Sequence, residues 1–249
     1  MNSSQITLDP LESIAAQISD HGYALMSGID LRPHIERFGS LADWSTFSAS
    51  WGDLHIDPYM ADGGRYRRRR HACFAIDKDA APRLAPHQAH YQSLEYNRLN
   101  GGIPRWFSPI DTRVCEGGSM QTILRFGARL FETLAPDITR WHCEAHQFRI
   151  EASPNEAAQP TPEGAHRDGV DYVLVLLIQR HNIASGTTQI FNSGGDELGS
   201  FTLAEPLDAA IIDDHRIFHG VTPVAPTQPD QASFRDVLVI TYSRHPATA

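Results

Sequence analysis

Apolar residues recur with a helical period in parts of the first 140 residues and with a strand-like period in most of the remainder. Between residues 10 and 21 they lie three or four positions apart, which predicts an amphipathic helix. Asp9 suits the N-cap of this helix, Pro10 suits its first turn and Gly22 suits its end. A longer helix of the same kind is expected over residues 119–134.

Short apolar runs bounded by Gly, Pro, Asn and Asp predict a series of strands. Near the N-terminus we expect a strand at 23–26, followed by partly helical residues 31–50 in which Trp44 and Phe47 anchor the core. The strands expected after residue 140 span 141–151, 170–180, 187–192, 198–203, 209–213, 217–224 and 236–243. Many short strands separated by glycine and proline are typical of a sandwich or a small barrel.

The length suits one large β domain, and no segment has the composition of a linker. We therefore expect a mainly β fold with N-terminal helices in a single domain, residues 1–249. Residues 1–140 are expected to give helical and mixed support and a lid, and residues 141–249 the barrel core with the functional site. Two proline-containing segments without a clear period, 82–109 and 152–164, are the candidate lids.

Charge narrows the classes of partner. The formal net charge is -9 and the pI is near 5.8, which argues against a nucleic-acid partner. The one basic stretch, residues 65–76, is therefore interpreted as a strand whose arginines alternate between its two sides and pair with acids. One of these arginines is still a candidate for holding a substrate carboxylate, because its planar fork suits that task.

Neither a membrane nor an oxidising compartment is indicated. With 41% hydrophobic residues the composition is that of a globular protein, and no apolar run reaches the roughly 18 residues of a membrane span. The N-terminus has no basic segment followed by an apolar one, so no signal peptide is expected. Cys73, Cys115 and Cys143 are an odd number without metal-binding spacing, and we expect them to be reduced and buried in a cytoplasmic protein.

Candidate chemistry is concentrated in one turn-rich segment, Pro-Glu-Gly-Ala-His-Arg-Asp-Gly. Its His166 and Asp168 are two positions apart, so in an extended chain they point the same way with Cα atoms roughly 6.5 Å apart. Gly164 and Gly169 flank them, and glycine permits bends that other residues do not. His219, in a later apolar run, is the candidate third ligand. Two histidines and one carboxylate, with other positions open, are how non-haem Fe(II) oxygenases hold iron.

Several alternatives remain open at this point. A bare His-x-Asp is common by chance, and a chain with 13 histidines nearly always offers a third downstream. His215 competes with His219, but the two lie roughly 13 Å apart along a strand, so one ion cannot bind both. We favour His219, because Gly220 and Pro223 follow it and resemble the turn after a barrel ligand. Zinc accepts the same donors, and cupin-type isomerases and binding proteins also build barrels with histidine-rich sites.

Arg235 is the candidate anchor for a co-substrate. It opens the last apolar strand and shares one face with Val237, Val239 and Thr241. A buried arginine on that face needs an anionic partner, and a dicarboxylate supplies one through a bidentate pair. The alternative is a strand-edge arginine paired with Asp236.

These residues resemble the Fe(II)/2-oxoglutarate-dependent dioxygenases, which place His-x-Asp, a distal His and a following Arg on a double-stranded β-helix. Three segments are similar to a bacterial subfamily that includes the free L-isoleucine 4-hydroxylases. They are His-Gln-Phe-Arg-Ile at 146–150, the turn-rich segment at 162–169, and Ile-Gln-Arg-His-Asn-Ile at 178–183.

The resemblance implies a core that is a double-stranded β-helix, a jelly-roll or cupin-like barrel. It also implies that His166, Asp168 and His219 hold Fe(II), that Arg235 binds the distal carboxylate of 2-oxoglutarate, and that O2 is the other co-substrate. An aspartate at 168, where related halogenases carry a small residue, implies hydroxylation.

The implied partner is a small molecule, for which a free L-amino acid is the leading candidate. No motif fixes the substrate-binding residues or the oligomeric state. Tyr172, which shares strand parity with Asp168, is a candidate for the substrate pocket; the alternative is a core tyrosine. The competing functions are a non-catalytic metal-binding or small-molecule-binding barrel and a zinc hydrolase.

Overall fold

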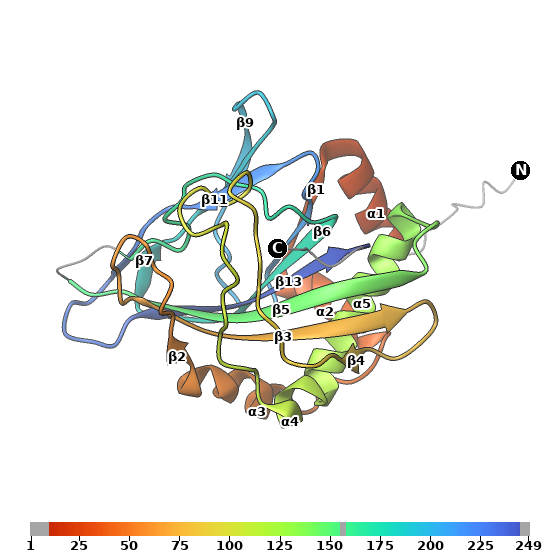
Figure 1. Ribbon diagram of the computed structural model, residues 1–249, viewed down its shortest axis with the longest axis horizontal. Helices are drawn as coiled ribbons and strands as arrows, with labels where there is room; N and C mark the ends of the chain where they lie inside the picture. Colours follow the sequence, from red (N-terminus) through yellow and green to blue (C-terminus); the bar gives the residue numbers. More distant parts are fainter. Residues whose placement is uncertain (1–9, 155–157, 245–249) are drawn as a thin grey trace, which may run out of the picture.

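The computed structural model describes residues 10–154 and 158–244, and its largest unit is an antiparallel sheet of eight strands (Figure 1). In spatial order the strands are β1 (Tyr23–Met26), β10 (Ala209–Asp213), β6 (Tyr172–His181), β13 (Phe234–Ser243), β5 (Arg140–Glu151), β3 (Arg67–Asp77) and β2 (His55–Ile56), with β4 (Arg83–Leu84) paired to β3. The strands predicted at 23–26 and 209–213 are confirmed to the residue. Because β1 and β3 belong to this sheet, the first 140 residues contribute strands as well as helices.

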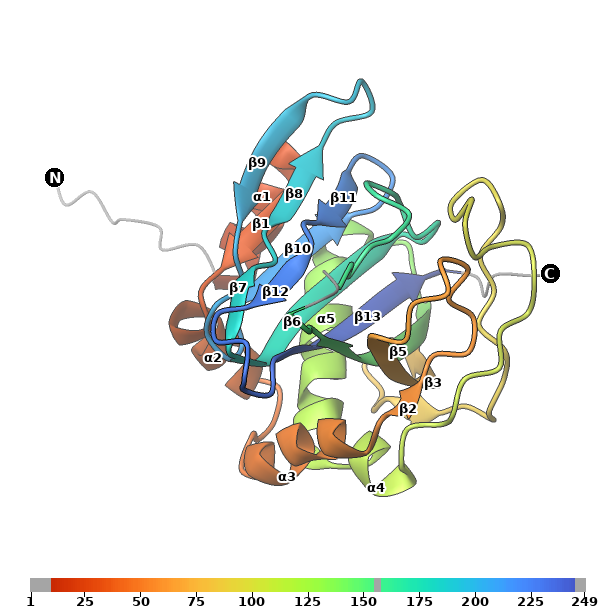
Figure 2. The same ribbon diagram turned by 90° about the vertical axis from the view of Figure 1, so that its left-hand side faces the viewer.

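Two smaller sheets complete the β structure. One contains β11 (Phe218–Val221), β8 (Thr188–Phe191) and β9 (Glu197–Phe201), which lie side by side at the top of the molecule in Figure 2. The other pairs β12 (Val224–Pro226) with β7 (Ile183–Ser185). The prediction of a single strand at 217–224 is wrong. Pro223 cannot donate a ladder hydrogen bond, so the segment forms two strands, β11 before it and β12 after it. The fold is mainly β, and the described strands do not close into one barrel.

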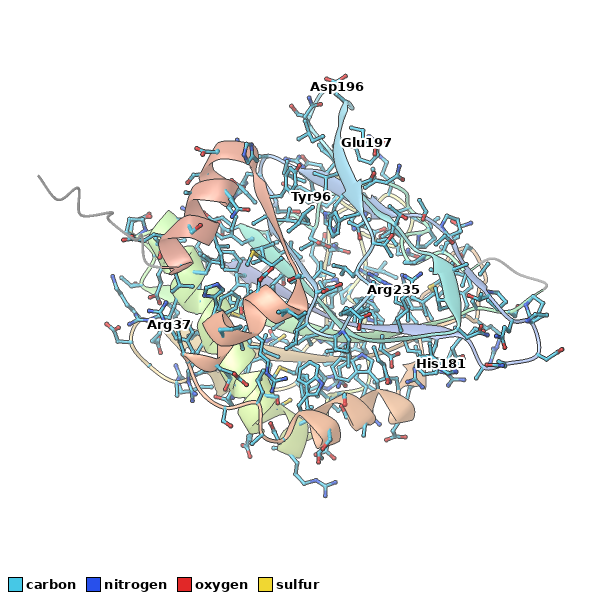
Figure 3. All side chains as sticks on the ribbon, turned by 180° about the vertical axis from the view of Figure 1, so that it is seen from behind. Arg37, Tyr96, His181, Asp196, Glu197 and Arg235 are labelled. Carbon is cyan, nitrogen blue, oxygen red and sulfur yellow. The ribbon has the colours of Figure 1, made fainter. Side chains whose placement is uncertain are left out.

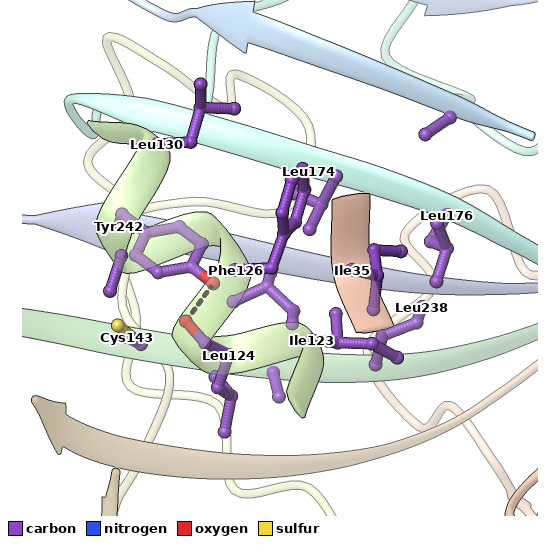
Figure 4. Packing of buried hydrophobic residues seen from close by; sticks show 14 of the residues in the cluster. Ile35, Ile123, Leu124, Phe126, Leu130, Cys143, Leu174, Leu176, Leu238 and Tyr242 are labelled. Carbon is purple, nitrogen blue, oxygen red and sulfur yellow. Dashed lines mark hydrogen bonds between the residues drawn. The ribbon is translucent and has the colours of Figure 1, made fainter. Parts of the chain in front are cut away.

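Helices cover one face of the large sheet. They are α1 (Pro10–His21), α2 (Gly28–Glu36), α3 (Trp44–Ala49), the 3-10 turn η1 (Ser50–Asp53), α4 (Thr112–Cys115) and α5 (Gly118–Leu134). The two predicted helices are confirmed, whereas the expected cap Asp9 lies outside the described residues. Gly127 lets α5 approach β13 closely, because a Cβ there would lie 2.3 Å from the Tyr242 hydroxyl. That hydroxyl donates to the Leu124 carbonyl at 3.2 Å within the buried core (Figure 4).

The alternation of side chains along each strand determines which of them point away from this core. Along β13, Leu238, Ile240 and Tyr242 pack against the helices, and the intervening residues face a cavity on the other side of the sheet. The arginine-rich strand β3 behaves in the same way: Arg67 and Arg69 are buried toward the cavity, while Arg68 and Arg70 are less buried. The predicted alternation of arginines is confirmed.

The remaining composition-based expectations concern cysteine and membranes. All three cysteines are free and buried, as predicted. In the described part of the chain, no helix is long and apolar enough to cross a membrane.

Candidate metal centre and the cavity around it

His166, Asp168 and His219 come together in the lining of the cavity. Each offers a ligand atom, and these atoms lie within 4.8 Å of one another. The Nε2 atom of His166 is 3.9 Å from Asp168 Oδ1, and the Nε2 atom of His219 is 3.6 Å from Asp168 Oδ2. His166 and His219 exchange two backbone hydrogen bonds of 3.0 and 2.9 Å, which hold the loop before β6 against β11. We call these three residues the ligand cluster.

The chain turns after Asp168 and bends at residues 169–171, so the strand predicted to begin at residue 170 begins at Tyr172. Asp214 shapes this turn, because its carboxylate accepts hydrogen bonds from the backbone N–H groups of Asp168, Gly169 and Val170 at 2.9, 2.7 and 3.1 Å. Gly169 has φ +80°, and a Cβ at that position would lie 2.5 Å from the ring of Tyr96. Burial, together with the charge of Asp168, raises the pKa of Asp214 to about 7.

The hydrogen-bond partners of the two imidazoles suit metal binding. His166 Nδ1 lies 3.0 Å from the Gly164 carbonyl, so it carries the proton and leaves the Nε2 lone pair toward Asp168. Burial lowers the pKa of His219 to about 4, and the neighbouring His166 contributes to this, so His219 is neutral and offers a lone pair.

The local charge also favours a cation. Burial disfavours a charged His166, yet the carboxylates of Asp168 and Glu163 outweigh it and raise the pKa of His166. Two imidazoles and one carboxylate around a position that attracts positive charge match the donor set of a non-haem Fe(II) site.

Two other residues singled out in the sequence lie elsewhere. The side chain of His215 is 66% exposed and its Nε2 is 3.1 Å from Asp171, so it belongs to a surface turn, as expected for the rival to His219. The prediction that Tyr172 faces the pocket is wrong. Its ring stacks on Phe131 of α5 with centroids 4.5 Å apart, because the turn at Gly169 breaks the strand parity that linked it to Asp168.

Arg235 is buried without an ion pair in the part of the chain that the structure describes. It is 2% exposed and lies well inside the molecule in Figure 3. Its Nε and Nη2 atoms have no hydrogen-bond partner among the described residues. Asp236 is not its partner, because that carboxylate accepts two bonds of 2.7 Å from Arg149 and one of 2.7 Å from Gln179. Burial and the neighbouring Arg180 lower the pKa of Arg235 to about 10.

The ligand cluster and Arg235 line one cavity of about 120 Å³. The segment 82–109, predicted as a lid or binding loop, supplies His90, Gln92, Asn97 and Arg105 to its wall. Gln92 donates to Asp168 Oδ1 at 3.0 Å and accepts from Asn97 at 3.1 Å and from Arg105 at 2.8 Å. Gln92, Arg105 and Glu163 were not predicted as cavity residues, and for the first two the only signal in the sequence is the unusual length of the loop.

A second group of histidines lies in the wall of the cavity. His71, His90, Glu144 and His146 are buried, and their ligand atoms also lie within 4.8 Å of one another. Glu144 Oε2 is 2.7 Å from both His71 Nε2 and His90 Nδ1, and Arg69 Nη2 is 2.6 Å from His146 Nδ1. We call this group the wall cluster.

The chain belongs to the 2OG-Fe dioxygenase family, whose model matches residues 48–241. This is a class of oxidoreductases whose cofactor and co-substrates are Fe(II), 2-oxoglutarate and O2.

The chain is similar in sequence or structure to several known proteins. A bsmA homologue from Methylobium petroleophilum, a solved structure, is 34% identical with a TM-score of 0.86, covering 95% of this chain and 96% of that one. The L-isoleucine-4-hydroxylase of Bacillus thuringiensis is 30% identical over 62% of this chain. The match spans 65% of that relative, just under two thirds of its length. The 3(1)-hydroxy-L-isoleucine 4-dioxygenase of Pantoea ananatis is 23% identical over 93% of this chain and 95% of its own length.

Proposed function

We propose that this protein is a dioxygenase that hydroxylates a small molecule, with free L-amino acids as the substrate class. The observation that carries the proposal is a buried Arg235 in the same cavity as the ligand cluster, whose Nε and Nη2 find no partner among the described residues. A triad of this kind needs a metal ion, and an unpaired buried guanidinium needs an anion. The amino-acid class rests on the names of the two isoleucine-related relatives.

Each residue has a defined part in this proposal. His166, Asp168 and His219 would hold Fe(II), and Fe(II) with 2-oxoglutarate supplies O2 activation and oxygen transfer to a C–H bond. Arg235 binds the distal carboxylate of 2-oxoglutarate through its planar fork. Apolar side chains in the same lining, those of Val237 and Val239 among them, exclude water from the cavity. Because Asp168 occupies a ligand position, hydroxylation is the proposed outcome and not halogenation.

The proposal extends to the fold. We propose that the large sheet and the three-stranded sheet are the two layers of a double-stranded β-helix, a jelly-roll or cupin-like core within one domain of residues 1–249. Support comes from the ligand cluster and Arg235, which lie on β11 of one sheet, on β13 of the other and on the loop between β5 and β6. The free, buried thiols suit a reducing compartment, and we propose the cytoplasm.

One experiment tests the activity. The purified protein, loaded anaerobically with Fe(II) and 2-oxoglutarate, should show a weak visible charge-transfer band. Admitting O2 with a panel of free L-amino acids should then yield succinate and, by mass spectrometry, a product heavier by one oxygen. His166→Ala is the background control. The absence of both band and succinate above that background contradicts the proposal, and turnover that persists without O2 and 2-oxoglutarate would indicate a hydrolase.

A further inference from the structure

Arg105 is a buried cation without an ion pair among the described residues. It is 2% exposed and comes from the loop 82–109. Its Nη2 donates to Gln92 Oε1 at 2.8 Å, but its Nε is buried and has no hydrogen-bond partner in the described chain. An amide oxygen satisfies a donor without neutralising the charge. Burying an uncompensated guanidinium is costly, so this position calls for an anion that the described chain does not supply.

Arg69 is a second cation that is only partly compensated. Its guanidinium lies between the rings of Phe107 and Phe148, 3.6 and 4.5 Å from their centroids. Its ion pair with Asp57 is long, with 3.7 Å between Arg69 Nη1 and Asp57 Oδ2, and Arg67 already binds that oxygen at 2.8 Å. The Nε of Arg69 is buried without a partner in the described part of the chain. Arg67 has an acid of its own, whereas Arg69 and Arg105 share a deficit of negative charge.

Glu163 lines the same cavity and lacks a positively charged partner in its ordinary hydrogen-bonding range among the described residues. Its Oε2 is buried and no residue of the described chain bonds to it, and its Oε1 is 3.6 Å from His166 Nε2. Burial and Arg67 lower the pKa of Arg105, and the charge of Glu163 acts in the opposite direction, so the two groups sense each other without forming an ion pair. A ligand that carries both an anionic and a cationic group would pair with the two arginines and with Glu163.

We propose that Arg105 and Arg69 bind the carboxylate, and Glu163 the ammonium group, of a zwitterionic α-amino acid. This inference rests on the proposed function and assigns its substrate site to named side chains. A dicarboxylate without an amine fits less well, because its second carboxylate would meet Glu163. A positively charged ligand without a carboxylate would leave both arginines unpaired.

Gln92 places this site beside the candidate metal centre. The same side chain accepts from Arg105 and donates to Asp168, so one residue separates the proposed carboxylate anchor from a ligand of the metal. Glu163 is in contact with His166 at the other side. An amino acid held by these groups lies with its α-carbon near the ligand cluster, and its side chain is left free to enter the rest of the cavity.

The test measures binding in the absence of O2, so it does not depend on turnover. Each of the twenty L-amino acids is titrated calorimetrically into the protein loaded with Fe(II) and 2-oxoglutarate, and into the metal-free protein. The tightest binder, with L-isoleucine as the first probe, is then compared with its carboxamide and with the 2-hydroxy acid of the same side chain. We expect each analogue to bind about tenfold more weakly or worse, because each loses a charge-assisted contact.

Two variants test which side chain binds the carboxylate and which binds the ammonium group of the amino acid. Arg105→Gln should weaken the amino acid about tenfold or more and leave the affinity for the carboxamide unchanged. Glu163→Gln should abolish the preference for the amino acid over the 2-hydroxy acid. Arg98→Gln and Glu95→Gln are matched controls, because both residues are exposed on the same loop and should change neither comparison.

The outcomes separate this inference from the proposed function. A normal visible band with no amino-acid binding in either state overturns the inference and leaves the dioxygenase proposal intact. The absence of a band, with binding to the metal-free protein that Arg105→Gln weakens, supports the amino-acid site and contradicts the dioxygenase proposal. If Glu163→Gln loses the band but keeps the preference for the amino acid, Glu163 serves the metal centre and its assignment here is wrong.

Discussion

Two groups of histidine and carboxylate lie at the cavity, the ligand cluster in its lining and the wall cluster partly behind it. Their hydrogen bonds distinguish the two groups more clearly than their composition does. In the wall cluster, Glu144 lies 2.7 Å from two imidazoles, so its charge is satisfied by N–H donors. In the ligand cluster the side-chain atoms nearest Asp168 in its two histidines are 3.6 and 3.9 Å away, too far for hydrogen bonds. One group is closed on itself, and the other leaves room for an ion.

The positions of the imidazole protons also distinguish the two clusters as candidate metal sites. Arginine only donates, so the contact from Arg69 fixes His146 Nδ1 as an acceptor and places the proton of a neutral His146 on Nε2, toward Glu144. That nitrogen has no lone pair for a metal. In the ligand cluster, by contrast, His166 Nδ1 bonds the Gly164 carbonyl, which leaves the Nε2 lone pair free, as expected of a metal ligand.

Removing the carboxylate from each cluster should have opposite consequences for metal binding. Asp168→Ala should weaken metal affinity by at least about a hundredfold, since it removes a ligand and not merely an outer partner. Glu144→Gln should keep one equivalent of metal, because Glu144 holds imidazoles and not an ion. Anaerobic Co(II) titration followed by visible absorption measures both. A second equivalent of Co(II) in the parent protein that disappears in Glu144→Gln would show that the wall cluster is also a metal site.

The arginines beside the two clusters provide the next test. Arg235→Gln should weaken 2-oxoglutarate binding about a hundredfold, because a buried charge pair is broken, and Arg235→Lys should recover part of it. In the ligand-free protein, Arg235→Gln should not lower the free energy of unfolding, since it removes an unpaired charge beside Arg180. Calorimetric titration and urea unfolding measure the two effects. Arg69→Gln, which removes the donor to His146, should instead lower stability.

Much of the fold was predictable because its signals are local. Short apolar runs between turn residues located β1 and β10, and period-two alternation placed Arg235 among the residues of the cavity face of β13. Tyr172 was misplaced because parity cannot be carried through a turn with a glycine at positive φ. The division of 217–224 at Pro223 has a local cause that alternation alone does not reveal.

The remainder of the site depends on register and on a loop without a period. The wall cluster forms because β3 and β5 pair with His71 opposite His146, and nothing local to either strand fixes that register. Gln92 and Arg105 reach the cavity from a loop whose path is set by tertiary contacts. Of 13 histidines, only the two with a motif or a family resemblance could be assigned to the ligand cluster from the sequence.

Gln92 joins the loop to the ligand cluster, and its loss should have a smaller effect than the loss of a ligand. Gln92→Ala removes the donor to Asp168 Oδ1, so we expect metal affinity to fall about tenfold, the lower end for an outer partner of a metal ligand. Co(II) titration is again the measurement, with Gln88→Ala in the same loop as the control. An unchanged affinity would mean that Asp214 and the turn alone orient Asp168.

The smallest expected effect concerns acid stability of the wall cluster. Burial, with help from His90 and Arg69, outweighs Glu144 and lowers the pKa of His71 below its usual 6.5. The unfolded chain therefore binds a proton below pH 6.5 that the native state does not, and the free energy of unfolding falls as the pH falls through this value. His71→Asn should flatten that fall between pH 6.5 and 4.5, by at most one proton or about 1.4 kcal/mol per pH unit. The pKa of Glu144 is lowered below 4.5, so the stability that Glu144 contributes is lost only beneath this window.

Urea unfolding of the metal-free protein across the window measures the slope, with the exposed His21→Asn as control. An unchanged slope in His71→Asn would mean that His71 is already protonated in the native state, and the wall cluster would then be an ion pair in place of a neutral hydrogen-bonded network.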